Sequence, residues 1–270
     1  MSERLDDNWF TEIFDSQGSA FSLKIKEKLH EVHSAYQHLE VYATETYGNL
    51  MVLDGCVMLT DRDNFLYHEM ISHPALFTHA DPRRVVIIGG GDCGTLREVL
   101  KHPGVEKVTQ IDIDEEVTKA AARFFPALTA SNDDPRAELL FEDGVKWINE
   151  APENSVDVII IDSTDPVGPA EGLFKADFLA KCHRLLRDGG VMVQQSEAPL
   201  YHTANIIREL RDDMRKAGFE SVATLPFPQP VYPSGWWSVT LAGKGLDVKA
   251  FRESAAGAAD FPCDYYSVDI

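Results

Sequence analysis

The sequence predicts an α/β protein in which a doubly wound, mainly parallel sheet follows a small antiparallel β unit. Short apolar runs at residues 85–88 and 158–161 are typical of parallel strands buried on both faces. From Arg84 onward such runs alternate with helical patterns, as in successive βαβ units. Ahead of residue 65 the pattern is shorter, richer in β-branched residues and interrupted by turn residues. We therefore expect two domains, over residues 1–64 and 65–270.

The first domain is expected to be small and β-stranded. Residues 39–63 have a β-like pattern, with possible hairpin turns at Gly48-Asn49 and Asp54-Gly55. Apolar residues at helical spacing then predict a helix over 65–78, which Asp81-Pro82 would end. This helix would link the two domains.

The second domain is expected to alternate strands and helices. The predicted strands are 85–88, 107–111, 137–141, 156–161, 190–195, 219–225 and 237–242. The predicted helices are 95–101, 115–125, 144–149, 173–186 and 203–217. Right-handed crossovers would place the ends of the first four strands along one edge of the sheet, where such folds bind ligands.

Charge narrows the choice of partners. The 270 residues include 44 acidic and 25 basic side chains, a formal net charge of −19, which would repel a phosphate backbone. We therefore expect no nucleic-acid partner. The charge is compatible with a cationic ligand, although an acidic surface also serves solubility.

We expect a cytoplasmic protein without a membrane partner. The N-terminus is acidic and lacks the basic and apolar segments of a secretory signal. No apolar stretch approaches the ~20 residues that a membrane helix needs. The cysteines are scattered and form no C-x-x-C pair, so reduced thiols are expected and neither a zinc site nor a disulfide framework is indicated.

A glycine loop follows the first strand of the second domain. Residues 89–94, GGGDCG, satisfy G-x-G-x-x-G between a strand and a helix. Such a loop could bind a dinucleotide, admit an adenosyl group or only pack a helix on a strand. The carboxylate of Asp92 would repel a pyrophosphate but attract a sulfonium or ammonium. The charge thus favours a sulfonium nucleoside over NAD.

Acidic residues also follow the next two strands. Asp112 lies where a carboxylate accepts hydrogen bonds from a ribose diol, whereas Asp114 is expected to cap the following helix. Asp143 could accept the exocyclic amine of adenine or could be only a helix cap. Both interpretations of Asp143 remain open at this point.

The fourth strand is followed by DSTDPVGPAE at residues 162–171. Asp162 and Asp165, together with Asp92, could form an acidic pocket for an alkyl diammonium, whose charges would need compensation. Solvated loop carboxylates are the alternative, since acidic residues are common in turns.

Four separated motifs resemble those of the spermidine synthase family of polyamine aminopropyltransferases. They are DRDNFLYHEM at 61–70, GGGDCG at 89–94, DSTDPVGPAEGLF at 162–174 and YPSG at 232–235. The resemblance spans residues 36–242. It implies a Rossmann-like domain, similar to that of S-adenosylmethionine methyltransferases, after a small β-stranded domain. It also implies aminopropyl transfer from decarboxylated S-adenosylmethionine, a co-substrate, to a diamine such as putrescine. The products would be spermidine and methylthioadenosine, with no metal and no other cofactor.

The resemblance also assigns residues. Asp162 corresponds to the family's proton acceptor, and Tyr67 and Tyr232 to the tyrosines beside the attacking amine. Four positions correspond to those that hold ammonium groups or face the diamine: His68, Asp92, Asp165 and Gln195. The nucleoside would be enclosed by Gln37, Gly89, Gly91, Asp112, Asp143, Gly144 and Pro169. A homodimer or homotetramer, joined through the N-terminal strands, is implied as well.

Some features depart from the family pattern or leave alternatives. Asp112 stands where many relatives have Glu, and Cys93 occupies a position that is usually glycine or alanine, where we expect inert packing. The pair Trp236-Trp237 could line the acceptor pocket. Cadaverine or agmatine could replace putrescine as the acceptor. The rival functions are a small-molecule methyltransferase that uses S-adenosylmethionine, an NAD-dependent oxidoreductase and an inactive polyamine-binding protein.

Overall fold

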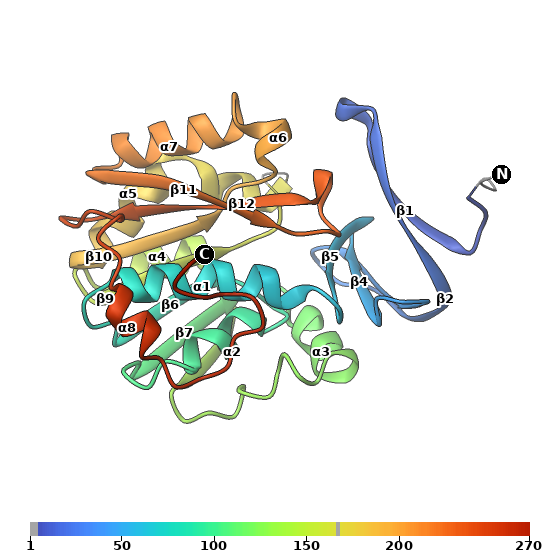
Figure 1. The fold of residues 1–270 in the computed structure, drawn as a ribbon, viewed down its shortest axis with the longest axis horizontal. Helices are drawn as coiled ribbons and strands as arrows, with labels where there is room; N and C mark the ends of the chain where they lie inside the picture. Colours follow the sequence, from blue (N-terminus) through green and yellow to red (C-terminus); the bar gives the residue numbers. More distant parts are fainter. Residues whose placement is uncertain (1–4, 166–167) are drawn as a thin grey trace.

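Two sheets form the framework of the protein. The computed structural model describes residues 5–165 and 168–270, and at positions 168 and 169 it describes the backbone alone. A five-stranded antiparallel sheet near the N-terminus is followed by a seven-stranded mixed sheet between helices (Figure 1). The predicted fold class is thereby confirmed.

The N-terminal sheet has the order β1-β2-β3-β4-β5, with every neighbouring pair antiparallel. Its strands are β1 (Trp9–Phe14), β2 (Ser19–His33), β3 (His38–Thr44), β4 (Asn49–Leu53) and β5 (Cys56–Thr60). The turns at 48–49 and 54–55 lie where the sequence places them, and Gly48, Asp54 and Gly55 have positive φ.

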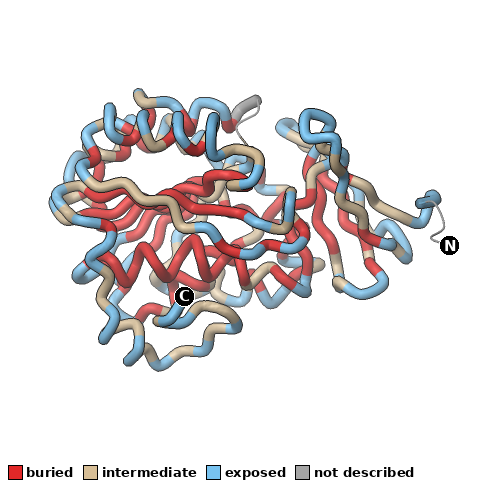
Figure 2. The backbone as a smooth tube through the Cα atoms, turned by 45° about the horizontal axis from the view of Figure 1, so that its top comes forward, coloured by how far each residue is buried: buried red, intermediate tan, exposed pale blue. Residues whose placement is uncertain are grey.

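The sequence analysis missed β1 and β2. Register shifts near Ile25 and Lys28 interrupt the alternation of inward and outward side chains in β2, so the period of two is lost. Figure 2 shows that the β1–β2 hairpin extends away from the large sheet and is mostly exposed or half-buried. Little burial leaves little hydrophobic pattern to detect.

The large sheet has the order β11-β12-β10-β9-β6-β7-β8. The five strands from β10 to β8 are parallel, whereas β12 is antiparallel to both β10 and β11. The strands are β6 (Arg84–Gly89), β7 (Lys107–Asp112), β8 (Ala137–Phe141), β9 (Val156–Asp162), β10 (Leu186–Gln195), β11 (Ser221–Pro228) and β12 (Trp236–Gly243). The first four strands therefore end at one edge, as predicted.

Helices cover both faces of this sheet. Side chains of α1 and α2 pack on one face with Val85 and Ile87, and side chains of α4, α5 and α7 pack on the other with Val86 and Ile88. Helix α3 instead packs its apolar side against the N-terminal sheet. The helices are α1 (Asn64–Thr78), α2 (Gly94–Leu100), α3 (Glu115–Phe124), α4 (Gly144–Glu150), α5 (Ala176–Leu185), α6 (Pro199–His202), α7 (Ile206–Lys216) and α8 (Glu253–Gly257), with short 3-10 turns η1 (Asp15–Gln17), η2 (Gly168–Phe174) and η3 (Pro233–Gly235).

Two of the predicted helices are longer than the helices in the structure. The helix expected over 173–186 is interrupted by the extended backbone of Lys175, and Leu186 already belongs to β10. The helix expected over 203–217 begins only at Ile206, because Asn205 has non-helical dihedral angles. Among the described residues, no helix has the length and apolar character needed to cross a membrane.

Candidate active site

The carboxyl ends of β6, β7 and β9 meet at the glycine loop. The Gly90 amide donates a hydrogen bond to the Asp162 carbonyl oxygen at 2.8 Å. A Cβ atom at Gly89 would lie 2.1 Å from that oxygen, and one at Gly91 would lie 2.9 Å from Asp112 Oδ2. Glycine is needed at Gly89 because the backbone of β9 lies so close, whereas the atom nearest to Gly91 is the end of the Asp112 side chain. The loop thereby brings Asp112 and Asp162 to one site.

Asp162 is held by two hydroxyl groups. Tyr67 Oη donates to Asp162 Oδ1 and Thr95 Oγ1 donates to Asp162 Oδ2, each at 2.6 Å. Burial raises the pKa of Asp162, and the nearby charge of Asp92 raises it further. A carboxylate that is fixed in position and more basic than usual is suited to accept a proton from an amine.

Asp92 is held ionised by His68. Its Oδ1 atom lies 3.1 Å from His68 Nε2 and accepts the Gly94 amide at 2.6 Å. Burial by itself would raise the pKa of Asp92, but the charge and hydrogen bond of His68 bring that pKa below its usual value. The loop therefore carries a negative charge beside the site.

His68 lies behind Asp92. It is 1% exposed and is absent from the residues that line the acceptor cavity described below, although the resemblance implies that it faces the diamine. Its ring packs over Gly94, where a Cβ atom would lie 2.2 Å from the ring. His68 would therefore act on a bound substrate indirectly, by holding Asp92.

A cavity next to Asp162 brings the remaining predicted acceptor residues together. The Tyr67 and Tyr232 rings lie edge to face, with centroids 5.9 Å apart, and Tyr232 Oη donates to the Met58 carbonyl at 2.5 Å. Gln195 donates to the Thr164 carbonyl at 3.2 Å. The cavity is lined by Glu12, Cys56, Val57, Met58, Tyr67, Ser163, Thr164, Asp165, Gln195, Tyr232, Pro233 and Trp237.

Sequence reasoning missed two acidic residues of this region, Glu12 and Glu197. Glu12 comes from β1, accepts the Val57 amide at 2.9 Å, and has its pKa raised by burial to about 7. Glu197 is buried beside Asp165, and burial and then the nearby charge of Asp165 raise its pKa well above the usual value. Two adjacent carboxyls disfavour each other's ionisation, so the raised pKa of Glu197 favours its neutral form.

The two omissions have different causes. Glu197 stands two residues beyond the end of β10, so the strand-end rule that identified Asp162 would also have identified it. Glu12 lies on a strand that sequence analysis did not predict and reaches the cavity from the other sheet. Nothing in the sequence near Glu12 indicates this position.

The predicted nucleoside side is built around Asp112 and Asp114. Burial raises the pKa of Asp112 to about 6, and its Oδ1 atom accepts the Asp114 amide at 2.8 Å. Asp114 caps α3 by accepting the Glu116 amide at 3.1 Å, as predicted. Gln37 donates to Asp114 Oδ2 at 2.8 Å, which ties the N-terminal sheet to this edge.

Asp143 is a helix cap and is exposed. Its Oδ1 atom accepts the amides of Val145 and Lys146 at 2.8 and 3.2 Å. A Cβ atom at Gly144 would lie 2.7 Å from the side chain of Ile88, so glycine allows α4 to start close to β6. The side chain of Pro169 lies outside the described part of the chain. A contact of Asp143 with adenine stays a prediction.

The two features noted beside the motifs also have positions in the structure. Cys93 is buried, and burial raises the pKa of its thiol to about 11, so it is not a thiolate at neutral pH. Trp237 is buried and lines the cavity with its ring centroid 4.8 Å from that of Tyr232, whereas Trp236 is exposed.

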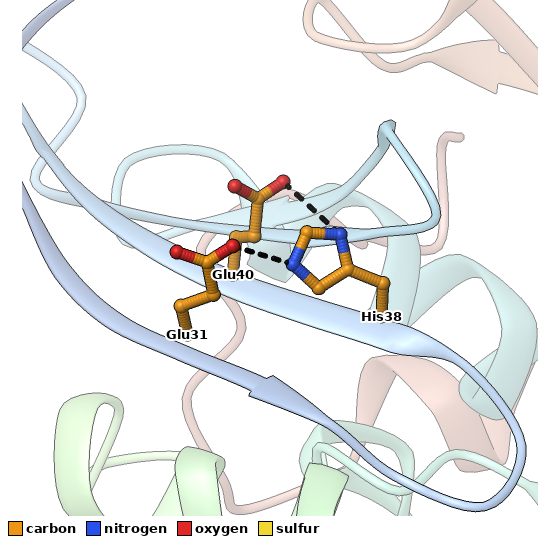
Figure 3. Close-up of side chains that lie close together, drawn as sticks. All are labelled: Glu31, His38 and Glu40. Atoms are coloured by element: carbon orange, nitrogen blue, oxygen red, sulfur yellow. Dashed lines mark hydrogen bonds and ion pairs between the residues drawn. The ribbon is translucent and has the colours of Figure 1, made fainter.

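A group of possible metal ligands lies away from this site, on the N-terminal sheet (Figure 3). His38 Nε2 lies 2.9 Å from Glu31, whereas the other ring nitrogen faces Glu40 at 3.9 Å. The ammonium of Lys28 bridges the two carboxylates, at 3.0 Å from Glu31 and 2.5 Å from Glu40. We interpret the group as an ion-pair network that joins β2 to β3.

Comparisons with known proteins show the family to which this chain belongs. Residues 64–251 match the family model described as spermine/spermidine synthase domain, and residues 8–61 match the one described as spermidine synthase tetramerisation domain. The polyamine aminopropyltransferase of Alkalilimnicola ehrlichii is 63% identical over 99% of this chain and 93% of its own length. That of Methylococcus capsulatus is 60% identical over 97% of this chain and 92% of its own.

Solved structures are also similar. A spermidine synthase in complex with the transition state analogue AdoDATO has a TM-score of 0.93 at 33% identity, over 99% of this chain and 91% of that one. The spermidine synthase from Thermotoga maritima has a TM-score of 0.91 at 34% identity, over 97% and 88%. The chain belongs to the spermine/spermidine synthase family. It is an enzyme of the polyamine aminopropyltransferase type.

The raised pKa of Glu12 predicts a pH-dependent gain in stability on its replacement. A carboxyl whose folded-state pKa is raised stabilises the fold at low pH, and this contribution is lost as pH rises through about 7. Glu12→Gln does not titrate, so its free energy of unfolding should exceed that of the wild type by about 2 kcal/mol at pH 8 and by less at pH 5. Urea unfolding at both pH values measures this. The exposed Glu27→Gln on β2 is the control, and equal differences at the two pH values would contradict the prediction.

Proposed function

We propose that this enzyme transfers the aminopropyl group of decarboxylated S-adenosylmethionine to putrescine, giving spermidine and methylthioadenosine. The observation that carries the proposal is the position of Asp162. Its carboxylate lies between the glycine loop, with the ionised Asp92, and a cavity whose lining includes two tyrosines and two acidic residues. A sulfonium donor and a diamine acceptor are the positive ligands that suit this charge.

In the proposed reaction Asp162 frees the attacking amine. An alkylammonium has a pKa near ~10.4 and is mostly protonated at neutral pH. Burial raises the pKa of the Asp162 carboxyl and lowers that of the bound ammonium, so the difference between the two pKa values becomes smaller. The carboxylate can then accept the proton. The nitrogen lone pair then forms a bond to the carbon next to sulfur. The carbon–sulfur bond breaks with its electron pair on sulfur, and the leaving group departs as a neutral thioether.

The two ammonium groups that do not react need compensating charges. Asp92 is the proposed partner of the donor's ammonium, and it is kept ionised by His68. Asp165, with Glu197 and Glu12 beside it, is the proposed partner of the distal ammonium of the acceptor, and Gln195 lines the same cavity. Gln37, Asp112 and the glycine loop support the nucleoside, with Asp143, Gly144 and Pro169 assigned through the family resemblance.

Three further expectations belong to this proposal. The reaction moves no redox electrons and its proton acceptor is a side chain, so no metal or redox cofactor is expected. The match of residues 8–61 to a domain described by its tetramerisation supports a homodimer or homotetramer formed through the N-terminal sheet. A cytoplasmic location is expected from the sequence.

A panel of acceptors tests the proposed reaction. The purified protein is incubated with decarboxylated S-adenosylmethionine and with putrescine, cadaverine or agmatine, and the products are analysed by mass. Putrescine should gain one aminopropyl unit in the best yield. Preference for another diamine would change the assigned acceptor. Transfer of a methyl group, or no transfer to any amine, would contradict aminopropyl transfer.

Replacement of Asp162 tests its role as proton acceptor. Asp162→Asn keeps the shape of the side chain but cannot take up the proton, so kcat should fall by roughly 10²-fold or more. Binding of methylthioadenosine, measured by calorimetry, should change little. If the variant turns over at a near-normal rate, Asp162 does not accept the proton.

Replacement of Asp112 tests the nucleoside side. Asp112→Ala removes an acceptor of hydrogen bonds from the ribose diol, a contact present in both ground and transition states, so the Kd of methylthioadenosine should rise about tenfold with a smaller change in kcat. Asp112→Asn retains one oxygen and is the matched control, with an intermediate effect. An unchanged Kd in the alanine variant would remove Asp112 from the nucleoside site.

A further inference from the structure

Glu69 is a buried carboxylate that the proposed reaction does not use. It is 1% exposed and follows His68 directly on α1. Its two oxygens accept three backbone amides of the C-terminal segment, from Asp264 at 2.7 Å, Tyr265 at 2.9 Å and Tyr266 at 2.7 Å. Within the described residues it forms no ion pair. Backbone amides alone therefore stabilise this charge.

The segment that supplies these amides holds α1 at several points. We call residues 251–266 the C-terminal strap; in Figure 1 it is the red segment that includes α8 and passes beside α2 and α1. Arg252 donates from its backbone to Phe77 O at 3.1 Å and from its side chain to Leu76 O at 3.0 Å, at the end of α1 where carbonyls lack helical partners. The strap thus contacts α1 at Glu69, in its second turn, and again at its C-terminal end.

Aromatic side chains join the strap to α1 between these contacts. Phe261 and Tyr266 stack on Phe77, with centroids 6.3 and 5.9 Å apart, and both also contact the ring of His73. Lys101, directly after α2, donates to the Pro262 carbonyl at 3.0 Å. These contacts make the strap a packed element of the fold.

We propose that Glu69 is a positioning residue, which anchors the C-terminal strap to α1 and thereby fixes Tyr67 and His68 in the active site. The inference rests on the proposed function. The start of α1 is held locally, because the Asn64 side chain donates to the carbonyls of Thr60 and Asp61 at 2.8 and 3.1 Å. Glu69 follows Tyr67 and His68 on the helix, so its bonds to the strap hold the turn that carries both side chains. A shift of that turn would move Tyr67 Oη away from Asp162 and His68 away from Asp92.

The position of α1 predicts which step depends on the strap. Tyr67 and His68 act on the amine side of the site through Asp162 and Asp92. The nucleoside side is carried by Asp112 on β7 and by Gln37 beside β3. Loss of the anchor should therefore impair transfer and leave nucleoside binding intact, whereas a general loss of structure would impair both.

Glu69→Gln tests the anchor. Both oxygens of Glu69 accept backbone amides, and glutamine replaces one oxygen by an NH2 group. At least one backbone N–H would then face another donor and lose its hydrogen bond. We expect faster hydrogen exchange at residues 264–266 and in the turn of α1 that carries Tyr67 and His68. We also expect kcat for aminopropyl transfer lowered at least about tenfold and the Kd of methylthioadenosine within about twofold of the wild type. Glu253→Gln, an exposed carboxylate in the strap, is the matched control and should behave as the wild type.

A chain shortened to residue 262 provides the second arm. It removes the same three amides together with the stacked ring of Tyr266, so adding Glu69→Gln should lower kcat no further than the shortening does alone. Additive losses, equal losses in nucleoside binding, or unchanged kcat and exchange in Glu69→Gln would overturn the proposal. If Glu69→Gln does not fold, the shortened chain is the test: its kcat should fall while its Kd for methylthioadenosine stays close to that of the wild type. If the wild type transfers no aminopropyl group, the proposed function fails, and unchanged exchange at α1 in both variants would separately reject the anchor.

Discussion

Buried negative charge at the carboxyl edge of the large sheet is the constraint on which this site depends. A buried carboxylate is unfavourable unless a cation, hydrogen-bond donors or a proton compensates it. The protein compensates each one differently. Asp92 is paired with His68, Asp162 is held by two hydroxyl groups, and Glu197, beside Asp165, has its pKa raised well above the usual value by burial and by Asp165. These different environments give neighbouring carboxyls different protonation properties and therefore different chemical roles.

Backbone geometry brings these charges together. Asp162 lies close to the loop because Gly89 and Gly90 have no side chains to separate β6 from β9. Thr95 and Tyr67, from the two helices on one face of the sheet, then reach the same carboxylate. A displacement at carbon needs its three reacting atoms nearly in line, so such fixed supports are worth more to the reaction than additional binding contacts.

The sequence predicted the residues that lie at the ends of parallel strands. Asp112 and Asp162 follow predicted strands directly and Asp92 lies in the loop after another, and the crossover rule for parallel sheets places such residues on one edge. The rule gives no information about residues that reach the site from the other sheet or from a helix. Glu12 arrives from a half-exposed hairpin whose pattern is broken by bulges, and the burial of His68 behind Asp92 depends on how α1 packs on α2, which no local spacing encodes.

The N-terminal sheet contributes to both halves of the site, so the site extends beyond the α/β domain. On the amine side it supplies Glu12 and the Met58 carbonyl that holds Tyr232. On the nucleoside side Gln37 is bound to Asp114, and α3 packs on β3. The distance between the two proposed ligand sites is therefore set partly by how the two sheets pack on each other. A substitution at that packing contact would shift both supports relative to Asp162 on the large sheet, and so would alter the alignment of donor and acceptor without touching either ligand.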